Sequence, residues 1–342
     1  MDLIYMNETL EDVGVLQEYE LDMAYGADEN DFECTVGIES HCCQGGYYLY
    51  IEGTEYGGVI DGIQVDTSNN ELVYSGRTWH GILGSKIIVP LLPGESSTDT
   101  VTITAVDSAG VSQVGKYLII SGDANACIGY IVERVGLGNL FSAQTETSGE
   151  TITNYQFNRY TDAYTGIFKM LASAGLKLKT RFVGGSVVLS AVPSYDYSQD
   201  EEFDSDLVEF KLDKQYRTVN HLICLGKGDL DERTVVHLYA DANGNISQTQ
   251  TQTGLSEYAA TYDYSNVESA EELILKGTEK LQSMWTQDKI KVDFDGTTDD
   301  YDVGDRVGAI DNVTGIVVAA TINKKIIKIE NGQTSISYDV GE

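Results

Sequence analysis

Positively charged side chains are missing from the beginning of the sequence. No lysine or arginine occurs between Met1 and Gly76, while the same stretch carries seventeen Asp and Glu, over half of the formal net charge of -32. A surface of this sign repels nucleic acid and anionic lipid headgroups, so tight binding of DNA or RNA is excluded as a function. The stretch is not an acidic tail, because apolar residues recur in it with regular spacing.

Long hydrophobic runs are also absent. No segment approaches the roughly 18 apolar residues that cross a bilayer, and the N-terminus has neither the basic region nor the apolar region of a signal peptide. We therefore expect a chain that is made and folded in the cytoplasm and does not insert into a membrane.

Cysteine is too sparse and too irregular for a disulfide framework. The five residues are odd in number and form no C-x-x-C pair, which favours buried, reduced thiols. Cys42 and Cys43 follow His41, a combination that also suits a metal ion. Neighbouring residues on a strand point to opposite faces, however, so the sequence predicts structural cysteines here.

Glycine and tyrosine, in contrast, are abundant. Thirty-five Gly and twenty-two Tyr, against only three Pro, favour many short strands connected by turns. With 342 residues, 42% of them hydrophobic, the chain is long enough for roughly two or three domains with cores of their own. The sequence therefore predicts a β-rich α+β fold.

Apolar and polar residues alternate through most of the first 90 residues. Residues 19–25 place apolar side chains at every second position, and a turn sequence at 26–30 leads into the same alternation at 32–36, which predicts a hairpin. Further strands are predicted at residues 47–52, 58–66 and 71–75. The N-terminal part is therefore expected to form an antiparallel sheet or barrel.

Helical patterns occupy the middle of the chain. Residues 77–89 indicate a short helix followed by an apolar strand. An apolar stripe predicts a helix at 121–136, with N-cap residues before it and a glycine at its end, and residues 162–175 repeat this pattern. Strands predicted at 176–182 and 186–192 complete a small α+β unit.

The rest of the chain returns mostly to strands. The acidic run at 200–204 is predicted to be an exposed connector, and residues 243–256 a linker or long loop. Ser265 and Glu268 form a capping box, which predicts a helix that ends at Trp285. Strands are predicted at 208–212, 218–225, 234–239 and 289–293, and on both sides of an Asn331-Gly332 hairpin turn. This leaves no room for an appended enzyme domain.

Two glycine-rich or acidic turns imitate ligand-binding motifs. Gly226-Lys227-Gly228 begins like a dinucleotide-binding loop, but Asp231 stands where the third glycine belongs and a strand follows in place of a helix. Residues 241–245 begin like a calcium loop, but Ile246 replaces the required glycine and Gln252 the bidentate glutamate. The sequence predicts turns at both positions.

Carboxylates and histidines offer the remaining candidates for chemistry. Asp299, Asp300 and Asp302, next to Gly304-Asp305, suit a cation or a carboxylate pair that hydrolyses glycosides, although such clusters arise by chance among 54 acidic residues. The histidines form no metal-binding motif, and an ordinary structural role is expected for all four: His41, His80, His221 and His237. His221 and His237 are candidates to face each other on paired strands. No catalytic, cofactor-binding or metal-binding residue is therefore predicted.

Three segments spread over most of the sequence match one family together. Residues 19–25 (YELDMAY) with 30–36 (NDFECTV) look like its opening hairpin. Residues 76–88 (GRTWHGILGSKII) are similar to its G-R-x-x-x-G-[IL]-L-x-x-[KR]-[IV]-[IV] segment, and residues 301–308 with 321–332 resemble its closing barrel. On these segments the chain resembles the tail-hub proteins, also called baseplate hub or tail-tip proteins, of long-tailed bacteriophages and prophages.

The resemblance implies a fold and a set of partners. Hub proteins of this family are homotrimers with two barrel-like domains per subunit, which adapt a hexameric tail tube to a threefold tip. The implied partners are a distal tail or tube protein, a tape-measure protein, and a tail fibre or spike. The implied location is the tail tip of the virion, after synthesis in the cytoplasm of a host bacterium, and no cofactor is implied.

The resemblance also suggests how the chain is divided. We assign the first part of a β-barrel-like hub domain to residues 1–116, a small α+β insert to 117–204, strands that return to the hub to 205–242, and a helix with a C-terminal β-barrel-like domain to 243–342. The predicted function is a structural, non-enzymatic trimeric ring through which DNA passes.

Two alternatives of other classes stay open at this point. One is a tail-associated cell-wall hydrolase that uses Asp299, Asp300 or Asp302, and the other is a carbohydrate-binding adhesin that uses the many tyrosines. For the ring hypothesis the acidic N-terminal stretch has a specific meaning, because carboxylates along a channel would keep passing DNA from sticking. The candidates for such a lining are Glu18, Glu20, Asp22 and Glu33.

Overall fold

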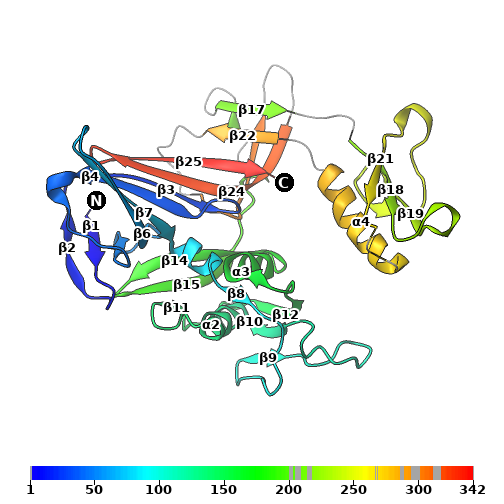
Figure 1. The fold of residues 1–342 in the computed structure, drawn as a ribbon, viewed down its shortest axis with the longest axis horizontal. Helices are drawn as coiled ribbons and strands as arrows, with labels where there is room; N and C mark the ends of the chain where they lie inside the picture. The colour runs from blue at the N-terminus through cyan, green and yellow to red at the C-terminus, as the bar shows by residue number, and fades with distance from the viewer. Residues whose placement is uncertain are drawn as a thin grey trace. The chain divides into compact units, whose positions relative to one another are not determined.

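The chain folds into two compact units, shown in Figure 1. The computed structural model describes residues 2–199, 203–204, 209–213, 218–265, 267, 269–285, 289–293, 301–310 and 317–341. The first unit combines residues 1–210 with 292–340, and the second comprises residues 211–291 and the last two residues. The first unit is therefore discontinuous in sequence.

A large, mostly antiparallel sheet forms one layer of the first unit. Its hydrogen-bonded order within this unit is β25-β24-β3-β4-β7-β6-β5-β1-β2. The strands are β1 (Leu3–Met6), β2 (Asp12–Leu16), β3 (Glu20–Gly26), β4 (Asp31–Gly37), β5 (Tyr48–Tyr50), β6 (Gly57–Asp66), β7 (Glu71–Thr78), β24 (Val317–Glu330) and β25 (Gln333–Gly341). The predicted N-terminal strands are confirmed, whereas β1 and β2 were not predicted.

The predicted opening hairpin is present in the expected register. β3 and β4 pair antiparallel with Leu21 opposite Cys34 and Met23 opposite Phe32, and all four side chains are buried. The intervening positions of both strands are mostly exposed acidic residues. This inside–outside alternation is the period-two pattern that the sequence showed.

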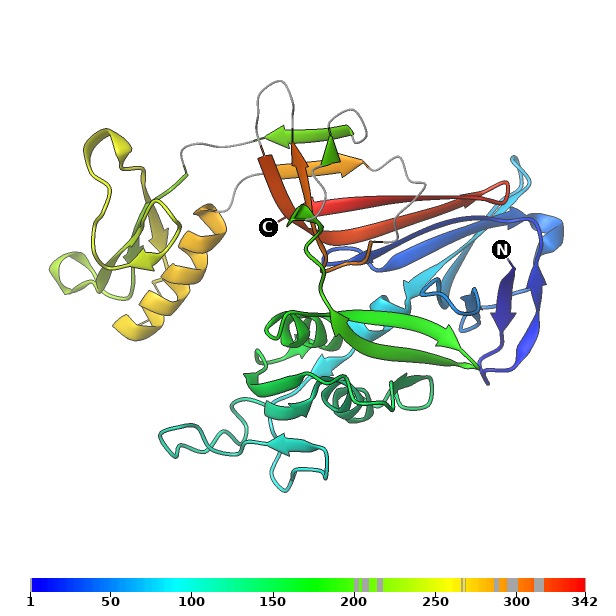
Figure 2. The same cartoon turned by 180° about the vertical axis from the view of Figure 1, so that it is seen from behind.

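The C-terminal strand β24 completes the sheet beside the N-terminal hairpin. It pairs antiparallel with β3, from Lys324 opposite Gly26 to Ile329 opposite Leu21, and both ribbon views show the red and blue strands side by side (Figures 1 and 2). The predicted Asn-Gly turn is confirmed, because Asn331 and Gly332 have φ angles of 51° and 74° between β24 and β25. Residues some 300 positions apart in sequence thus form neighbouring strands.

The expected barrel shape is not confirmed. In the part of the chain that the structure describes, the large sheet runs as an open path that ends at β2, and no closed barrel is found. The coarser prediction of a β-rich α+β fold with several antiparallel sheets holds. Parallel pairs also occur. They join β11 (Phe141–Ala143) to β15 (Ser186–Pro193), β16 (Phe203–Asp204) to β23 (Arg306–Ile310), and β18 (His221–Leu225) to β21 (Ala259–Asp263).

A helix-containing layer packs within the same unit. The predicted helices and the β14–β15 hairpin are confirmed, while several short strands were not predicted. Its elements are α1 (Trp79–Gly84), β8 (Ile87–Ile88), β9 (Val101–Ile103), β10 (Ile119–Asp123), α2 (Ala124–Arg134), β11 (Phe141–Ala143), β12 (Thr151–Gln156), β13 (Thr161–Asp162), α3 (Ala163–Ala172), β14 (Leu176–Val183) and β15 (Ser186–Pro193).

Aromatic side chains form the centre of the core between these elements. Trp79, at the start of α1, is fully buried and stacks on Phe182 of β14 with ring centroids 5.6 Å apart. Tyr50 of β5 contacts the same Phe182 ring at 4.0 Å. Burial of such large apolar surfaces is the main stabilising contribution, and here it joins the large sheet to β14.

The second unit is a small sheet covered by one helix. Its strand order is β20-β19-β18-β21, and its elements are β18 (His221–Leu225), β19 (Val235–Ala240), β20 (Ile246–Ser247), β21 (Ala259–Asp263) and α4 (Ala270–Trp285). Leu273 and Leu281 of α4 are fully buried. Gly277 lies between them, and a Cβ atom there would come within 2.4 Å of the Cys224 sulfur, so the glycine permits close helix–sheet contact.

The start of α4 differs from the prediction. The helix begins at Ala270, and its cap is Ser269, whose hydroxyl accepts a hydrogen bond from the Glu272 amide at 3.4 Å. The prediction of Ser265 as N-cap is therefore wrong. Glu268, its proposed partner, lies outside the described residues. Ser269 and Glu272 have the same S-x-x-E spacing as Ser265 and Glu268, so the spacing alone does not distinguish the two positions.

The connecting regions differ from expectation in two places. Strand β20 (Ile246–Ser247) lies within the predicted linker at 243–256, and the second difference is in the acidic run. Residues 200–202 of the predicted acidic connector lie outside the described residues, but Phe203–Asp204 forms strand β16, which pairs in parallel with β23. The other elements are β17 (Glu209–Asp213), β22 (Lys289–Asp293), β23 (Arg306–Ile310) and the 3-10 turns Ile38–Ser40, Tyr197–Gln199, Leu230–Glu232 and Gly254–Ser256.

The four-part domain assignment stays a prediction. None of the helices in the described residues is long and apolar enough to span a membrane.

The cap of α2 gives a test of this layer. Asp123 accepts hydrogen bonds from the Asn125 amide at 3.0 Å and from the Thr147 and Ser148 hydroxyls at 2.8 and 2.7 Å. We expect Asp123→Ala to lower the free energy of unfolding by about 1–2 kcal/mol in urea titrations at pH 7. The matched control Asp99→Ala, at an exposed position, should change it by less than about 0.5 kcal/mol.

The pH dependence of this effect follows from the pKa of Asp123. Burial alone raises that pKa, but hydrogen bonds from Ser148 and Thr147 outweigh it, and the net pKa is lowered. A lowered carboxyl pKa stabilises the fold above the pKa of the unfolded chain, about 3.9, and this contribution is lost as the pH falls below it. The difference between wild type and Asp123→Ala should therefore shrink at acidic pH; a constant difference would contradict the assignment.

Candidate functional site

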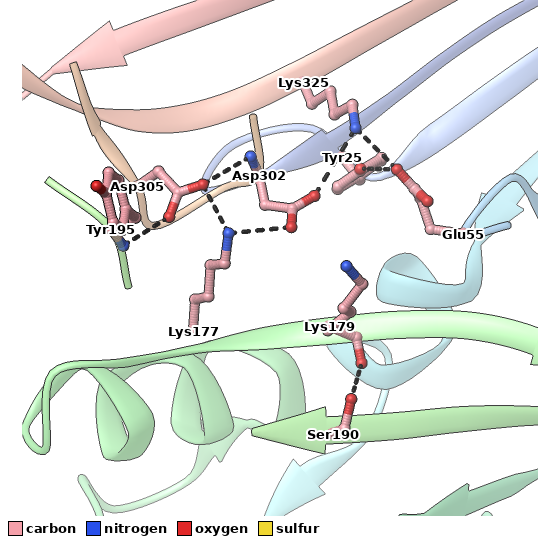
Figure 3. Close-up of polar contacts among 9 residues, drawn as sticks. All are labelled: Tyr25, Glu55, Lys177, Lys179, Ser190, Tyr195, Asp302, Asp305 and Lys325. Carbon is pink, nitrogen blue, oxygen red and sulfur yellow. Dashed lines mark hydrogen bonds and ion pairs between the residues drawn. The ribbon is translucent and has the colours of Figure 1, made fainter. Parts of the chain in front are cut away.

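A network of buried ion pairs connects distant segments of the first unit. Lys177 of β14 contacts Asp305 at 2.6 Å and Asp302 at 3.0 Å, and Lys325 of β24 contacts Glu55 at 2.9 Å. The side chains of Lys325 and Asp305 are 0% exposed. Figure 3 shows the two lysines approaching the carboxylates from opposite sides, Lys177 from β14 and Lys325 from β24. We call these five residues the lysine–carboxylate network.

Asp305 is the most completely satisfied member of the network. Besides Lys177, its carboxylate accepts hydrogen bonds from the backbone amides of Tyr195 at 2.9 Å and Asp302 at 3.0 Å. A buried carboxylate is costly unless its lone pairs are occupied in this way. Asp305 therefore fixes the loop before β23 against the end of β15.

Lys325 organises the other half of the network. Its ammonium also lies 3.8 Å from Asp302, and Glu55 accepts a second hydrogen bond from the Tyr25 hydroxyl at 2.8 Å. Burial, followed by the nearby Glu55 charge, raises the pKa of Tyr25 well above its usual value, so the hydroxyl stays protonated and donates. The network thus ties β3, the β5–β6 loop and β24 together.

Burial and charge act in opposite directions on Lys177. Burial alone lowers its pKa, but the contacts with Asp305 and Asp302 outweigh this, and the net pKa is raised. Lys177 therefore remains protonated at all physiological pH values. A lysine held in this state is an ion-pair partner and not a general base or a nucleophile.

His80 lies next to the network on α1 and is neutral. Burial lowers its pKa to about 3. Its Nε2 atom is 3.0 Å from the Thr180 hydroxyl, and its ring stacks on Tyr25 with centroids 4.4 Å apart. Its Nδ1 atom is buried and has no hydrogen-bond partner among the described residues.

A cavity of about 190 Å³ lies beside these groups. It is lined by aromatic, cationic and acidic side chains together with backbone of the β5–β6 loop: Tyr25, Gly53, Thr54, Glu55, Tyr56, His80, Tyr164, Phe168, Leu178, Lys179, Thr180, Arg181, Asp302 and Val303. All of these residues belong to the first unit. The cavity is therefore a property of that unit alone.

The sequence identified only a part of this site. Asp302 was a candidate carboxylate, but Asp299 and Asp300 lie outside the described residues. Lys177, Lys325 and Glu55 were missed. The available signal was positional, because Lys325 stands at an inward-facing position in the alternation of β24 with Ile327 and Ile329, which are buried as well. A lysine at such a position requires a buried anion.

The two turn predictions are confirmed. Gly226-Lys227-Gly228 lies in the connection between β18 and β19, where Gly226 and Thr234 are joined by a backbone hydrogen bond of 2.8 Å. In the second turn the Asp241 carboxylate accepts hydrogen bonds from the amides of Asn243 and Asn245 at 2.8 and 2.9 Å. Both segments use their polar groups to close turns.

The histidines and cysteines have structural contacts. His221 Nε2 and His237 Nδ1 lie 2.8 Å apart on paired strands, as the sequence suggested, and His221 also contacts Glu257. His41 contacts the Tyr74 hydroxyl at 3.0 Å. Within the described residues, no cluster of three or more acidic, histidine or cysteine side chains suits a metal ion.

Cys42 and Cys43 correct one detail of the prediction. The expectation that they lie on a strand and point to opposite faces is wrong, because they follow the 3-10 turn Ile38–Ser40 in irregular structure and their sulfur atoms are 3.6 Å apart. All five cysteines are free thiols, and burial raises the pKa of Cys34 to about 12. A thiol with so high a pKa is a poor nucleophile.

Comparison with known proteins gives the same fold in two solved structures. The tail protein from Neisseria meningitidis MC58 is 12% identical, with a TM-score of 0.51 over 100% of this chain and 96% of that one. The 43 kDa tail protein of prophage MuSo2 from Shewanella oneidensis is 11% identical, with a TM-score of 0.52 over 99% of this chain and 98% of that one. No family model and no curated protein matches the sequence. Over its full length, the chain thus has the fold of phage and prophage tail proteins.

Removing Lys325 tests the importance of the lysine–carboxylate network. Lys325→Met leaves Glu55 without its closest cation, and we expect the free energy of unfolding to fall by about 3–5 kcal/mol in urea titrations. The double variant Lys325→Met/Glu55→Gln should recover a part of this loss, because no uncompensated charge remains there.

A matched lysine on the same strand serves as the control. Lys328 pairs with Asp22 at 2.7 Å, but both side chains are about half exposed, 49% and 52%. Lys328→Met should therefore cost less than about 1 kcal/mol. If both variants lost the same free energy of unfolding, the buried Lys325–Glu55 pair would contribute no more to stability than the exposed Lys328–Asp22 pair.

The buried histidine predicts a pH dependence of stability. The pKa of His80 is about 3 in the fold and about 6.5 in an unfolded chain, so unfolding takes up a proton between these values. The contribution of neutral His80 is complete above pH 6.5 and declines at lower pH by about 1.4 kcal/mol per pH unit. Urea titrations at pH 7 and pH 5 measure this slope.

Two histidine variants separate this effect from general acid sensitivity. His80→Gln removes the titrating group and should flatten the slope between pH 7 and pH 5, whatever its effect on absolute stability. His41→Gln, at an exposed position, should keep the wild-type slope. An unchanged slope in the His80 variant would disprove the assignment.

Proposed function

We propose that this chain is a structural hub protein of a phage or prophage tail tip. The observation that carries the proposal is the fold that the whole chain shares with the tail proteins from Neisseria meningitidis and from prophage MuSo2. The segments that resemble the hub family support it independently, since residues 19–25, 30–36, 76–88 and 321–332 all lie in or beside the large sheet. The protein then resides in the tail of the virion.

The hub is a homotrimer in this proposal. Its barrel-like β domains are arranged around a threefold axis and connect the tail tube to the tip. Its partners are a distal tail or tube protein, a tape-measure protein, and a fibre or spike. A closed symmetric ring of this kind requires extended surfaces between identical subunits.

The proposed hub works without catalysis. Of the three carboxylates offered for wall hydrolysis, Asp299 and Asp300 lie outside the described residues. Asp302 is engaged by Lys177 at 3.0 Å and lies 3.8 Å from Lys325, which suits a structural role. The adhesin alternative needs exposed tyrosines; Tyr25, Tyr74 and Tyr164 are buried, whereas Tyr160, Tyr195 and Tyr258 are exposed. The contacts of Asp302 therefore favour the structural function over wall hydrolysis.

The acidic face of the sheet suits the passage of DNA. Glu20 and Asp22 of β3 and Glu33 of β4 are exposed on one face, and Asp22 stands directly opposite Glu33. In the proposed ring this face lines the channel, where its charge repels the phosphate backbone. The repulsion keeps DNA mobile as it passes.

The oligomeric state tests this proposal directly. We expect light scattering of the purified chain at micromolar concentration to give three times the mass of one chain. A stable monomer over this concentration range would contradict the hub function, because a ring cannot form from it.

An edge strand offers a more specific test of assembly. β2 ends the sheet and exposes Val13 and Val15 by 51% and 47%, features that favour association with another chain. We expect Val13→Lys/Val15→Lys to shift the measured mass toward that of a monomer. Ile63→Lys/Val65→Lys is the matched control, since these exposed valine and isoleucine side chains lie on the interior strand β6. An unchanged mass in the β2 variant would exclude this edge from the interface.

A further inference from the structure

The cavity next to the lysine–carboxylate network has an unusual charge for this protein. Two carboxylates line it, Glu55 and Asp302, but each is paired with a lysine that does not line it. The two lining cations, Lys179 and Arg181, have no ion pair with any described residue. The charge left over at the cavity is therefore positive, in a chain whose formal net charge is -32.

Counting the network and the cavity together gives the size of this surplus. Lys177, Lys179, Arg181 and Lys325 supply four positive charges, and the three carboxylates of Glu55, Asp302 and Asp305 oppose them. One positive charge remains. A single anionic group inside the cavity would neutralise the site, whereas a dianion would leave it negatively charged.

Strand geometry directs Lys179 toward this space. Lys177 and Lys179 are two positions apart on β14 and therefore project from the same face. Figure 3 shows both side chains on one side of β14, with ion-pair contacts drawn to Lys177 and none to the ammonium group of Lys179. Lys177 of β14 is therefore engaged in ion pairs, whereas the ammonium group of Lys179 remains available to bind a ligand.

His80 also lines the cavity. The residue is 3% exposed, its Nε2 atom lies 3.0 Å from the Thr180 hydroxyl, and its Nδ1 atom is buried. The imidazole is therefore a neutral part of the wall, and its NMR signal reports a ligand bound beside it.

The lining also includes four aromatic residues. They are Tyr25, Tyr56, Tyr164 and Phe168, and the ring centroids of Tyr164 and Phe168 lie 6.4 Å apart. Aromatic walls favour an apolar or planar body on the ligand. The cavity therefore combines a polar, positively charged side with an apolar side.

We propose that this cavity binds a small organic monocarboxylate. Lys179 and Arg181 pair with the carboxylate, and the aromatic residues of the lining contact the apolar body. The charge count distinguishes this ligand from a phosphate dianion, and the volume of about 190 Å³ excludes a nucleotide or an oligosaccharide. Bound there, the ligand would stabilise the first unit.

The test uses the full-length chain with two carboxylate probes, acetate and benzoate. The chain has four histidines, so a spectrum of the 15N-histidine-labelled protein resolves each ring, and His80→Gln identifies the signal of His80. We expect benzoate to shift the His80 signal in a saturable way while the other three stay in place. Benzoate should bind more tightly than acetate because it also contacts the aromatic wall, and neutral benzamide should not saturate the site.

Variants at matched lysines complete the test. Lys179→Met should weaken benzoate binding at least about tenfold in calorimetric titrations, since it removes a charged partner, and Lys179→Arg should retain most of the affinity. Lys169→Met, at an exposed position on α3 away from the cavity lining, should leave the affinity unchanged. The proposal is overturned if neither probe produces a saturable His80 shift, if benzamide binds as well as benzoate, or if Lys179→Met binds benzoate like the wild type. These outcomes are independent of the oligomeric state.

Discussion

The fold depends on ion pairs between an N-terminal segment without cations and cations from other parts of the chain. Lysines of β24 supply three of them: Lys324 pairs with Glu29, Lys325 with Glu55 and Lys328 with Asp22. Arg77, the first cationic residue in the sequence, pairs with Asp61 of the acidic segment. These contacts differ in kind, because exposed pairs contribute little to stability whereas a buried pair strongly penalises the loss of either partner. The buried pair between Lys325 and Glu55 therefore favours β24 as the strand that lies beside β3.

The lysine–carboxylate network extends this constraint to a second layer. Asp302 lies between Lys325 of the large sheet and Lys177 of the β14–β15 hairpin, so one carboxylate receives cations from both layers. Apolar packing of Trp79, Tyr50 and Phe182 brings the same layers together without specifying their exact alignment. Hydrogen-bonded charges have narrower geometric requirements. Their alignment also defines the cavity and leaves Lys179 available beside it.

Local sequence patterns predicted much of the fold. The elements that were not predicted depend on pairing with strands that are distant in sequence. Alternation gave β3, β4, β6 and β7, and capping residues with glycine stops gave α2 and α3, because these signals depend on neighbours in sequence. The short strands β9, β12 and β16 have little periodicity and exist through their pairing partners. The same distinction applies to the site: Asp302 stood out within an acidic cluster and Lys325 within the alternation of β24, whereas Lys177 and Glu55 become recognisable only when segments far apart in sequence meet.

The position of β24 in the sheet has a consequence for the order of folding. Until residues 317–330 leave the ribosome, β3 has β4 as its only antiparallel neighbour among the described strands, and Glu55, Asp22 and Glu29 lack their lysines. The growing chain therefore carries an open strand edge surrounded by mutually repelling carboxylates. That repulsion disfavours association between incomplete chains, which otherwise tend to aggregate through such edges. The large sheet of the first unit is therefore completed only after residues 317–330 have been made, and chains that stop before them keep this edge open.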